Sequence, residues 1–186
     1  PTLWPLLSAC GAVTPGVAAM TTIDTTGWKA EFIRRAVALT PETVDHFMGL
    51  YAVDCDFSDP FHSLKGRKAI AQAYRSMFLN LHVPCFTDLV IAEVATLPTE
   101  GKAGLEGEPL ELAARWVFRF AVGPGKPMRA IAGTSWLFLD GRTGLITRHE
   151  DHWDAASLFE SFSALSWGVR FLRQRVARAA LVTNMT

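Results

Sequence analysis

The stretch HEDHWD, residues 149–154, is the densest group of ionisable side chains in the sequence. In a β-strand alternate residues share a face, which predicts one face carrying Leu145, Thr147, His149, Asp151 and Trp153. A carboxyl group in an apolar wall is suited to moving a proton, because desolvation disfavours its charged form. The pattern predicts that Asp151 and His149 form an acid/base pair beside Trp153. The alternative is that both side chains bond to neighbouring backbone and only close the sheet.

A second acid lies in FSDPFHS, residues 57–63, where Asp59 precedes a proline. An aspartate before proline is typical of a turn, since its carboxylate can cap the turn backbone. The functional alternative is that Asp59 and His62 face a ligand. We expect Asp59 and Asp151 to line the same cavity, where two acids can divide acid and base roles or orient a polar group of the ligand.

The elements that would position these residues follow from the spacing of apolar side chains. Helical spacing predicts three helices, over residues 28–39, 40–51 and 66–78. Runs rich in β-branched and aromatic residues predict four long strands joined by hairpins, over residues 85–97, 110–122, 128–139 and 144–153. This order predicts an α+β fold, in which N-terminal helices cover a cone-shaped, curved antiparallel sheet of about four long strands. An amphipathic C-terminal helix over 155–182 follows, and the cone is a natural small-molecule pocket.

The first nineteen residues carry no charge and are interrupted by Pro5 and Pro15. Residues 7–10 are similar to a bacterial lipoprotein cleavage box, but the basic residues that precede such a box are missing. We expect residues 1–19 to be an upstream or vector-derived extension and residues 20–186 to form a single domain, the usual outcome for a chain of 186 residues.

Composition narrows the classes of function. The formal net charge is zero, which argues against nucleic acid as a partner. The C-terminal helix is basic, but a single basic helix without a lipidation signal makes membrane binding a weak alternative. The three cysteines are scattered, which favours a reducing, cytoplasmic compartment over disulfides or zinc. His149 and His152 would point to opposite faces of a strand, and no other spacing suggests a metal or a cofactor.

Two motifs carry a resemblance to a known group of proteins. LYAVDCDFSDPFHSLKGRKAIAQAYRSMF, residues 50–78, and GTSWLFLDGRTGLITRHEDHWD, residues 133–154, resemble the SnoaL-like branch of the nuclear-transport-factor-2-like superfamily. That superfamily includes ketosteroid isomerases, limonene epoxide hydrolases and polyketide cyclases. The resemblance covers about residues 28–175. The two motifs are specific for the cone fold. They are less specific for a function, because this fold hosts enzymes, ligand binders and assembly modules.

The comparison with ketosteroid isomerases implies that Asp59 is a general base. The isomerase also needs an oxyanion hole made of a tyrosine and a neutral carboxylic acid. By resemblance the tyrosine position falls near Arg35, and the carboxylic acid position falls on Ser135. A serine can donate a hydrogen bond but Arg35 is no tyrosine, so the isomerase set is incomplete.

The comparison with limonene epoxide hydrolases implies that Asp151 is one acid of a water-activating Asp-Arg-Asp triad. Arg115 matches the arginine, and the second acid falls on Val117 or Trp116. That triad is also incomplete. In each comparison this sequence has one of the catalytic acids but lacks residues that act with it.

We therefore predict a SnoaL-like protein that binds a small, largely apolar molecule. It would catalyse acid/base isomerisation, cyclisation or hydration of a polyketide, steroid or terpenoid-like compound. The predicted catalytic residues are Asp59, Asp151 and His149, and the predicted ligand-binding residues are His62, Trp153, Arg115, Trp116 and Ser135. The alternative is a non-catalytic ligand-binding or dimerisation module. Because the strands are apolar on both faces, we also predict a homodimer through the sheet.

Overall fold

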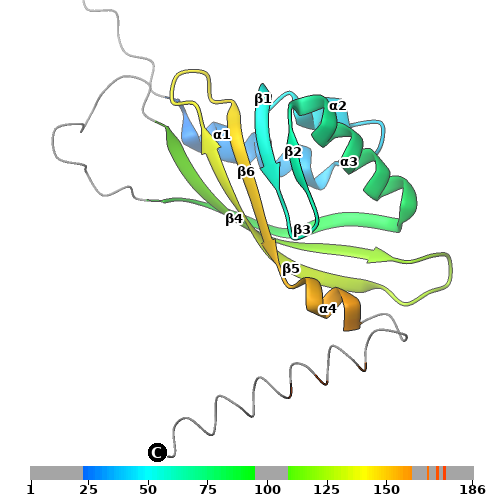
Figure 1. The fold of residues 1–186 in the computed structure, drawn as a ribbon. Coiled ribbons are helices and arrows are strands. Elements are labelled where there is room, and N and C mark those ends of the chain that lie inside the picture. Colours follow the sequence, from blue (N-terminus) through cyan, green and yellow to red (C-terminus); the bar gives the residue numbers. More distant parts are fainter. Residues whose placement is uncertain (1–22, 95–108, 161–166, 168–170, 172–173, 175–186) are drawn as a thin grey trace, which may run out of the picture.

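The computed structural model describes residues 23–94 and 109–160, together with residues 167, 171 and 174 (Figure 1). The predicted extension over residues 1–19 lies outside the described residues. So does most of the predicted C-terminal helix, of which the described part is α4, Ala155–Glu160, and the three single residues beyond it.

The sheet has six strands in the order β2-β1-β6-β5-β4-β3. The four long strands predicted from the sequence are present, and two strands were not predicted. The strands are β1 Tyr51–Ser58, β2 Ser63–Lys65, β3 His82–Glu93, β4 Leu110–Ala121, β5 Arg129–Leu139 and β6 Ile146–Trp153. All neighbours pair antiparallel except β1 and β6, which pair in parallel. The sheet curves without closing, as the cone prediction requires (Figure 1).

Helices cover the concave side of this sheet (Figure 1). They are α1 Thr25–Val37, α2 Val44–Met48 and α3 Arg67–Asn80. The carboxylate of Asp24 begins α1 by accepting the backbone N–H groups of Thr26 and Gly27, which helix geometry would otherwise leave without partners. Within the described part of the chain, no helix combines the length and the apolar character needed to cross a membrane.

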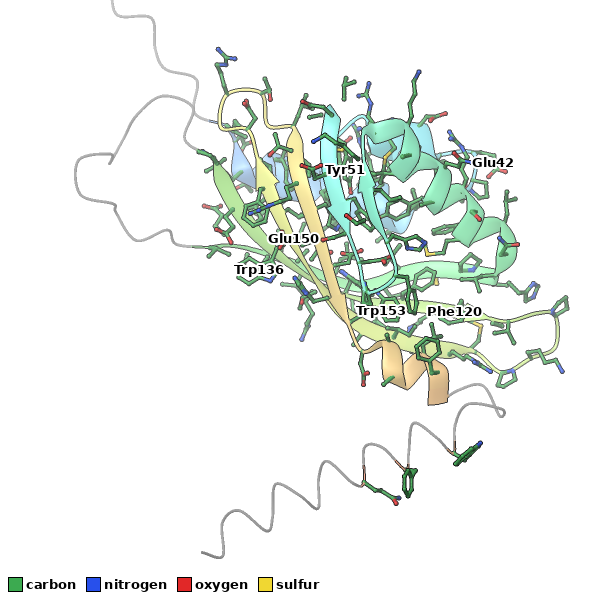
Figure 2. The ribbon with its side chains drawn as sticks, viewed as in Figure 1. Glu42, Tyr51, Phe120, Trp136, Glu150 and Trp153 are labelled. Atoms are coloured by element: carbon green, nitrogen blue, oxygen red, sulfur yellow. The ribbon has the colours of Figure 1, made fainter. Side chains whose placement is uncertain are left out.

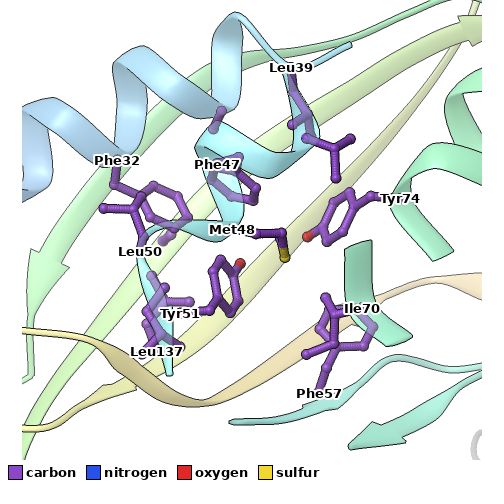
Figure 3. Close-up of a cluster of buried hydrophobic side chains, with 14 of the residues drawn as sticks. Phe32, Leu39, Phe47, Met48, Leu50, Tyr51, Phe57, Ile70, Tyr74 and Leu137 are labelled. Carbon is purple, nitrogen blue, oxygen red and sulfur yellow. The ribbon is translucent and has the colours of Figure 1, made fainter. Parts of the chain in front are cut away.

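The core lies where these helices meet the inner faces of β1, β4, β5 and β6. Phe32, Phe47 and Tyr74 from the helices pack with Tyr51 and Leu137 from the strands (Figure 3). Burying a side chain of this size contributes about 1.5–3 kcal/mol each. The core therefore fixes the positions of α2 and α3 over the sheet.

Two irregular positions on β3 accompany its bend. Val83 and Asp88 have positive φ angles of 50° and 55°. The pairing of β3 with β4 shifts register next to each of them, between His82 and Cys85 and between Thr87 and Val90. Such irregularities bend a strand and increase its twist. They let β3 curve around the concave side and help to open the cone.

A third irregularity changes the face predicted for residues 145–153. The pairing of β5 with β6 shifts register between Phe138 and Leu139. Ile146 is consequently buried and Thr147 is exposed, so the prediction that Leu145 and Thr147 share the inner face is wrong. Beyond the shift the alternation resumes, and His149, Asp151 and Trp153 do share the inner face.

Candidate functional site

A cavity of about 280 Å³ lies between α3 and the concave face of the sheet. Its wall is almost entirely apolar, and aromatic residues from β3 and β4 form a large part of it: Phe86, Trp116, Phe118 and Phe120. Three ionisable residues other than tyrosine reach it: Asp59, His62 and Asp151. None of the described residues that line it is a lysine or an arginine. The cavity therefore suits an uncharged, ring-shaped molecule.

Asp151 is held from two sides at one of its oxygen atoms. His149 Nε2 lies 2.8 Å from Asp151 Oδ1, and the Ser135 hydroxyl donates to the same oxygen over 2.5 Å. Ser135 lies directly opposite Asp151 on β5, because these two residues pair across the strands. His149 and Ser135 are 2% and 3% exposed, so they stand behind Asp151 and do not line the cavity.

Each of these two partners has a partner of its own. Tyr51 Oη lies 2.8 Å from His149 Nδ1, and Trp116 Nε1 donates to Ser135 Oγ over 2.8 Å. An indole N–H can only donate, so the Ser135 hydroxyl accepts from Trp116 and uses its own proton for Asp151. A carboxylate only accepts, so His149 donates to Asp151 from Nε2. In the tautomer with its single ring proton there, Nδ1 accepts from the Tyr51 hydroxyl.

The second carboxylate oxygen of Asp151 has no hydrogen-bond partner among the described residues. The Asp151 side chain is 14% exposed, and that exposure is to the cavity it lines. Asp151 therefore has one oxygen committed to the protein and one, Oδ2, left for a ligand.

Tyr74 brings a second phenol close to Tyr51 and also lines the cavity. Figure 3 shows the hydroxyl groups of Tyr51 and Tyr74 on neighbouring sides of the same buried cluster. Burial, with the nearby charge of Asp151, raises the pKa of Tyr51 and the pKa of Tyr74 well above the ordinary value for a phenol. Both hydroxyls therefore keep their protons and remain able to donate hydrogen bonds.

Asp59 is a turn cap that also lines the cavity. Its Oδ1 accepts the backbone N–H groups of Phe61 and His62 over 2.7 and 2.6 Å. The His62 ring nitrogen Nδ1 lies 3.0 Å from both carboxylate oxygens. The turn-capping alternative raised by the sequence is therefore present in the structure, and Asp59 is far more engaged than Asp151.

Aromatic rings gather at the end of the cavity where β6 stops. Phe61 from the β1–β2 turn packs against Trp153 and Phe159, with ring centroids 5.1 and 5.7 Å apart. Figure 2 shows Trp153 at this end of β6, next to α4. Leu158 of α4 also lines the cavity, so α4 forms part of its boundary.

The structure brings most of the predicted site residues together. Four predicted residues besides Asp151 line the cavity: Asp59, His62, Trp116 and Trp153. Arg115 does not join them. It is exposed on the outer face of β4, and its cross-strand neighbour Thr134 is exposed there too, so Arg115 cannot contact Asp151 or a ligand in the cavity.

Sequence reasoning missed Tyr51, Tyr74 and Gly133. Tyr74 was read as one residue of an apolar helix stripe, and Tyr51 as the end of a helix. A glycine inside a strand is a signal of close approach by another group, and that signal was available for Gly133. Within the described residues, no three His, Cys, Asp or Glu side chains gather closely enough to hold a metal ion.

No protein-family model and no curated protein matches the chain. Solved structures do resemble it. A candidate polyketide cyclase from Silicibacter sp. TM1040 is 18% identical with a TM-score of 0.52, over 74% of this chain and 96% of that one. A candidate scytalone dehydratase from Novosphingobium aromaticivorans DSM 12444 is 12% identical with a TM-score of 0.53, over 70% and 83%.

A candidate isomerase from Bacillus subtilis is 14% identical with a TM-score of 0.51, over 75% of this chain and 94% of that one. Identities this low carry information about the fold alone. Together with the six-stranded curved sheet and its covering helices, they confirm the expected architecture. The chain shares the cone-shaped α+β fold of these structures, which is the fold expected from its sequence resemblance.

Proposed function

We propose that the chain binds a small, uncharged ring compound in the cavity and exchanges a proton with it through Asp151. One observation carries the proposal: Asp151 lines the cavity, its Oδ1 is held by His149 and Ser135, and its Oδ2 has no hydrogen-bond partner among the described residues. A general base must be held in place and still have a free acceptor atom within reach of the proton it removes. Asp151 meets both requirements.

The proposed reaction begins at a carbon next to a carbonyl group of the ligand. Asp151 Oδ2 takes the proton, the C–H bond breaks, and its electron pair stays on the ligand as an enolate. Return of the proton to another atom of the ligand gives isomerisation. Attack of the enolate on a second carbonyl forms a C–C bond and an alkoxide, which takes the proton back from Asp151 and completes cyclisation. If the enolate instead expels a β-hydroxyl group, that group takes the proton from Asp151 and leaves as water, and the reverse sequence is hydration. Polyketides and cyclic terpenoid ketones contain the enolisable groups that such chemistry needs.

The size and the charge of the cavity limit the ligand. An apolar cavity of about 150 Å³ holds one benzene ring, so a cavity of about 280 Å³ suits roughly two fused rings. A carboxylate or phosphate on the ligand would face Asp59 and Asp151 with no lysine or arginine among the described lining residues. We therefore expect neutral ligands to bind and their anionic analogues to be rejected.

The similar structures are named for a cyclase, a dehydratase and an isomerase. All three reaction types move protons on carbon or oxygen, which supports the proposal for this chain. His149 and Ser135 act in it as positioning residues. Asp59 and His62, nearer the turn, are candidates for a second acid or for orienting a polar group of the ligand.

The rival function is a ligand-binding or dimerisation module without catalysis. The observation that favours it is the turn-capping role of Asp59, which leaves Asp151, among the described lining residues, as the one acid with a carboxylate oxygen free of protein hydrogen bonds. The homodimer remains a prediction as well. Its surface would be the outer face of the sheet, where Trp136 and Glu150 pair across β5 and β6 (Figure 2).

Deuterium exchange into 2-tetralone tests the proposal without knowledge of the natural substrate. This neutral ketone has two fused rings and acidic protons beside its carbonyl. We expect the protein to bind it and to accelerate exchange of those protons in D₂O, followed by NMR. Asp151→Asn should slow the catalysed exchange roughly 100-fold or more. The asparagine Oδ1 can still accept from His149 and Ser135, so we expect the fold to be kept.

The matched control is His152→Gln, on the same strand but exposed on the outer face. It should leave the exchange rate unchanged. Bound 2-tetralone that exchanges no faster than in buffer would contradict catalysis and favour the binding module. Exchange that survives Asp151→Asn would show that another group is the base. Failure of 2-tetralone to bind would contradict the ligand class itself.

A further inference from the structure

Gly133 sits in the middle of β5, between two tryptophans on neighbouring strands. It pairs with Trp116 of β4 on one side and with Trp153 of β6 on the other. All three positions face the cavity side of the sheet. A glycine inside a strand weakens the strand by roughly 0.5–1 kcal/mol relative to alanine, because it has more backbone freedom to lose.

The position excludes any side chain. A Cβ atom built on Gly133 would lie 2.4 Å from both Cη2 and Cζ2 of Trp116, and 2.9 Å from Cζ3. These distances are well inside van der Waals contact, and the atoms belong to a rigid ring. The indole of Trp116 therefore lies directly across β5, in space that every residue except glycine would fill.

This pose brings the indole nitrogen to Ser135, two residues further along β5. Trp116 Nε1 donates to Ser135 Oγ over 2.8 Å, and Ser135 donates to Asp151 Oδ1. The serine hydroxyl has a single proton and can rotate. With the indole N–H bound at its oxygen, the hydroxyl is held with that proton directed at Asp151. Without the indole, the hydroxyl can turn toward a ligand or toward backbone.

We propose that Gly133 and Trp116 are positioning residues for Asp151, a role that rests on the proposed proton transfer. The missing side chain at Gly133 admits the indole, the indole orients the Ser135 hydroxyl, and the hydroxyl occupies Asp151 Oδ1. The proton of the ligand then goes to Oδ2, whose position is fixed relative to the cavity.

Gly133→Ala tests the first link of this series. The added methyl group must push the indole away, so we expect catalysed exchange of 2-tetralone to fall roughly 10- to 100-fold, since small misplacements of a reacting group have effects of this size. The Trp116 indole N–H signal, assigned with Trp116→Phe, should shift and lose its protection from solvent exchange. Gly123→Ala is the control, because its new Cβ would meet nothing closer than 3.9 Å.

A double variant separates this steric role from a general loss of stability. Trp116→Phe removes the indole N–H together with most of the atoms that a side chain at Gly133 would meet. In that background Gly133→Ala should change neither folding nor the exchange rate further, which is the non-additivity expected of groups in contact. If the Gly133→Ala single variant does not fold but the double variant does, the clash with the Trp116 indole is the cause of the unfolding.

Three results would overturn the inference. The Gly133→Ala variant could keep both the indole N–H signal and the parental exchange rate. The two substitutions could prove additive. The double variant could fail to fold, in which case Trp116 is not the group that Gly133 accommodates. The indole N–H signal of Trp116 can be measured without turnover. If the exchange rate survives Asp151→Asn, the proposed function is refuted, but the NMR signal still shows whether Gly133 accommodates the indole.

Discussion

Tyr51→Phe removes one buried hydroxyl and almost nothing else. The Tyr51 side chain is 0% exposed, and its ring packs at the centre of the core with Phe47 and His149 (Figure 3). Phenylalanine preserves that packing. The change leaves His149 Nδ1 without the hydroxyl that lies 2.8 Å away.

The cost follows from what is left unpaired. A buried polar group without a partner costs about 1–3 kcal/mol, and His149 is 2% exposed, so water cannot replace the hydroxyl easily. We expect Tyr51→Phe to lower the free energy of unfolding by about 1–3 kcal/mol. In a chain of this size each kcal/mol lowers Tm by about 2–4 °C. The total stability of such a domain is only about 5–15 kcal/mol, so the loss is easily measured.

Urea unfolding should show a lower midpoint with an unchanged slope, since the fold and its buried area are retained. Nitrogen NMR of the His149 ring should show that the proton is no longer confined to Nε2. Tyr74→Phe is the comparison, because it removes a neighbouring hydroxyl but leaves the bond between Tyr51 and His149, and its cost should be smaller. A Tyr51→Phe variant as stable as the parent, with an unchanged His149 ring spectrum, would refute the proposed direction of the hydrogen bonds.

Three further predictions concern the backbone, the surface and the assembly. Val83 is 61% exposed and has a φ of 50°, a strained angle for a β-branched residue, so Val83→Gly should stabilise the protein by about 0.5–1 kcal/mol in urea unfolding. Val53→Gly, at an exposed strand position without positive φ, should destabilise it. Hydrogen bonds from two arginines of α1 lower the pKa of Glu31 from 4.5 to about 2. The pKa is thus lower in the folded state, so the contribution of Glu31 is present above pH 4.5 and is lost as the pH falls toward 2, and Glu31→Gln should flatten the rise of stability with pH across that window. Finally, sedimentation at micromolar concentration should show a dimer that Trp136→Glu dissociates, and a parent protein that sediments as a clean monomer would contradict the interface.

The long strands and the covering helices could be predicted because each carries its own pattern. The alternation of Trp116, Phe118 and Phe120 is enough to predict β4 as a strand, although its apolar residues on both faces leave open which face points inward. β1 was missed for a physical reason. Its inward residues Tyr51 and Cys55 follow directly on a short helix, and the strand finds its partner β6 almost a hundred residues later. A single strand whose pairing is that distant has little local signal beyond its alternation.

In the site, too, the features with a local sequence pattern could be predicted and those that depend on distant contacts could not. Alternation on β6 is sufficient to direct Asp151 and Trp153 inward, but it does not reveal the register shift that exposes Thr147. His149 lies on β6 with Asp151, but the residues that complete the network come from β1, β4 and β5. No spacing along the chain could therefore identify Tyr51. The one local signal that was available, a glycine in the middle of a strand, marked Gly133.

The parallel pairing of β1 with β6 also fixes the order in which the protein can assemble. β6 is the last strand of the sheet along the chain, yet it lies between β1 and β5. The hydrogen bond between Tyr51 and His149 joins residues 98 positions apart. Contacts between such distant residues form late, because the chain between them must be ordered first. In a nascent chain that ends before Ile146, the edges of β1 and β5 that face β6 have no partner strand, although β1 can already pair with β2 on its other edge. Those two unpaired edges are where aggregation would begin, and the arrival of β6 from the ribosome removes both edges and assembles the Asp151 site in one step.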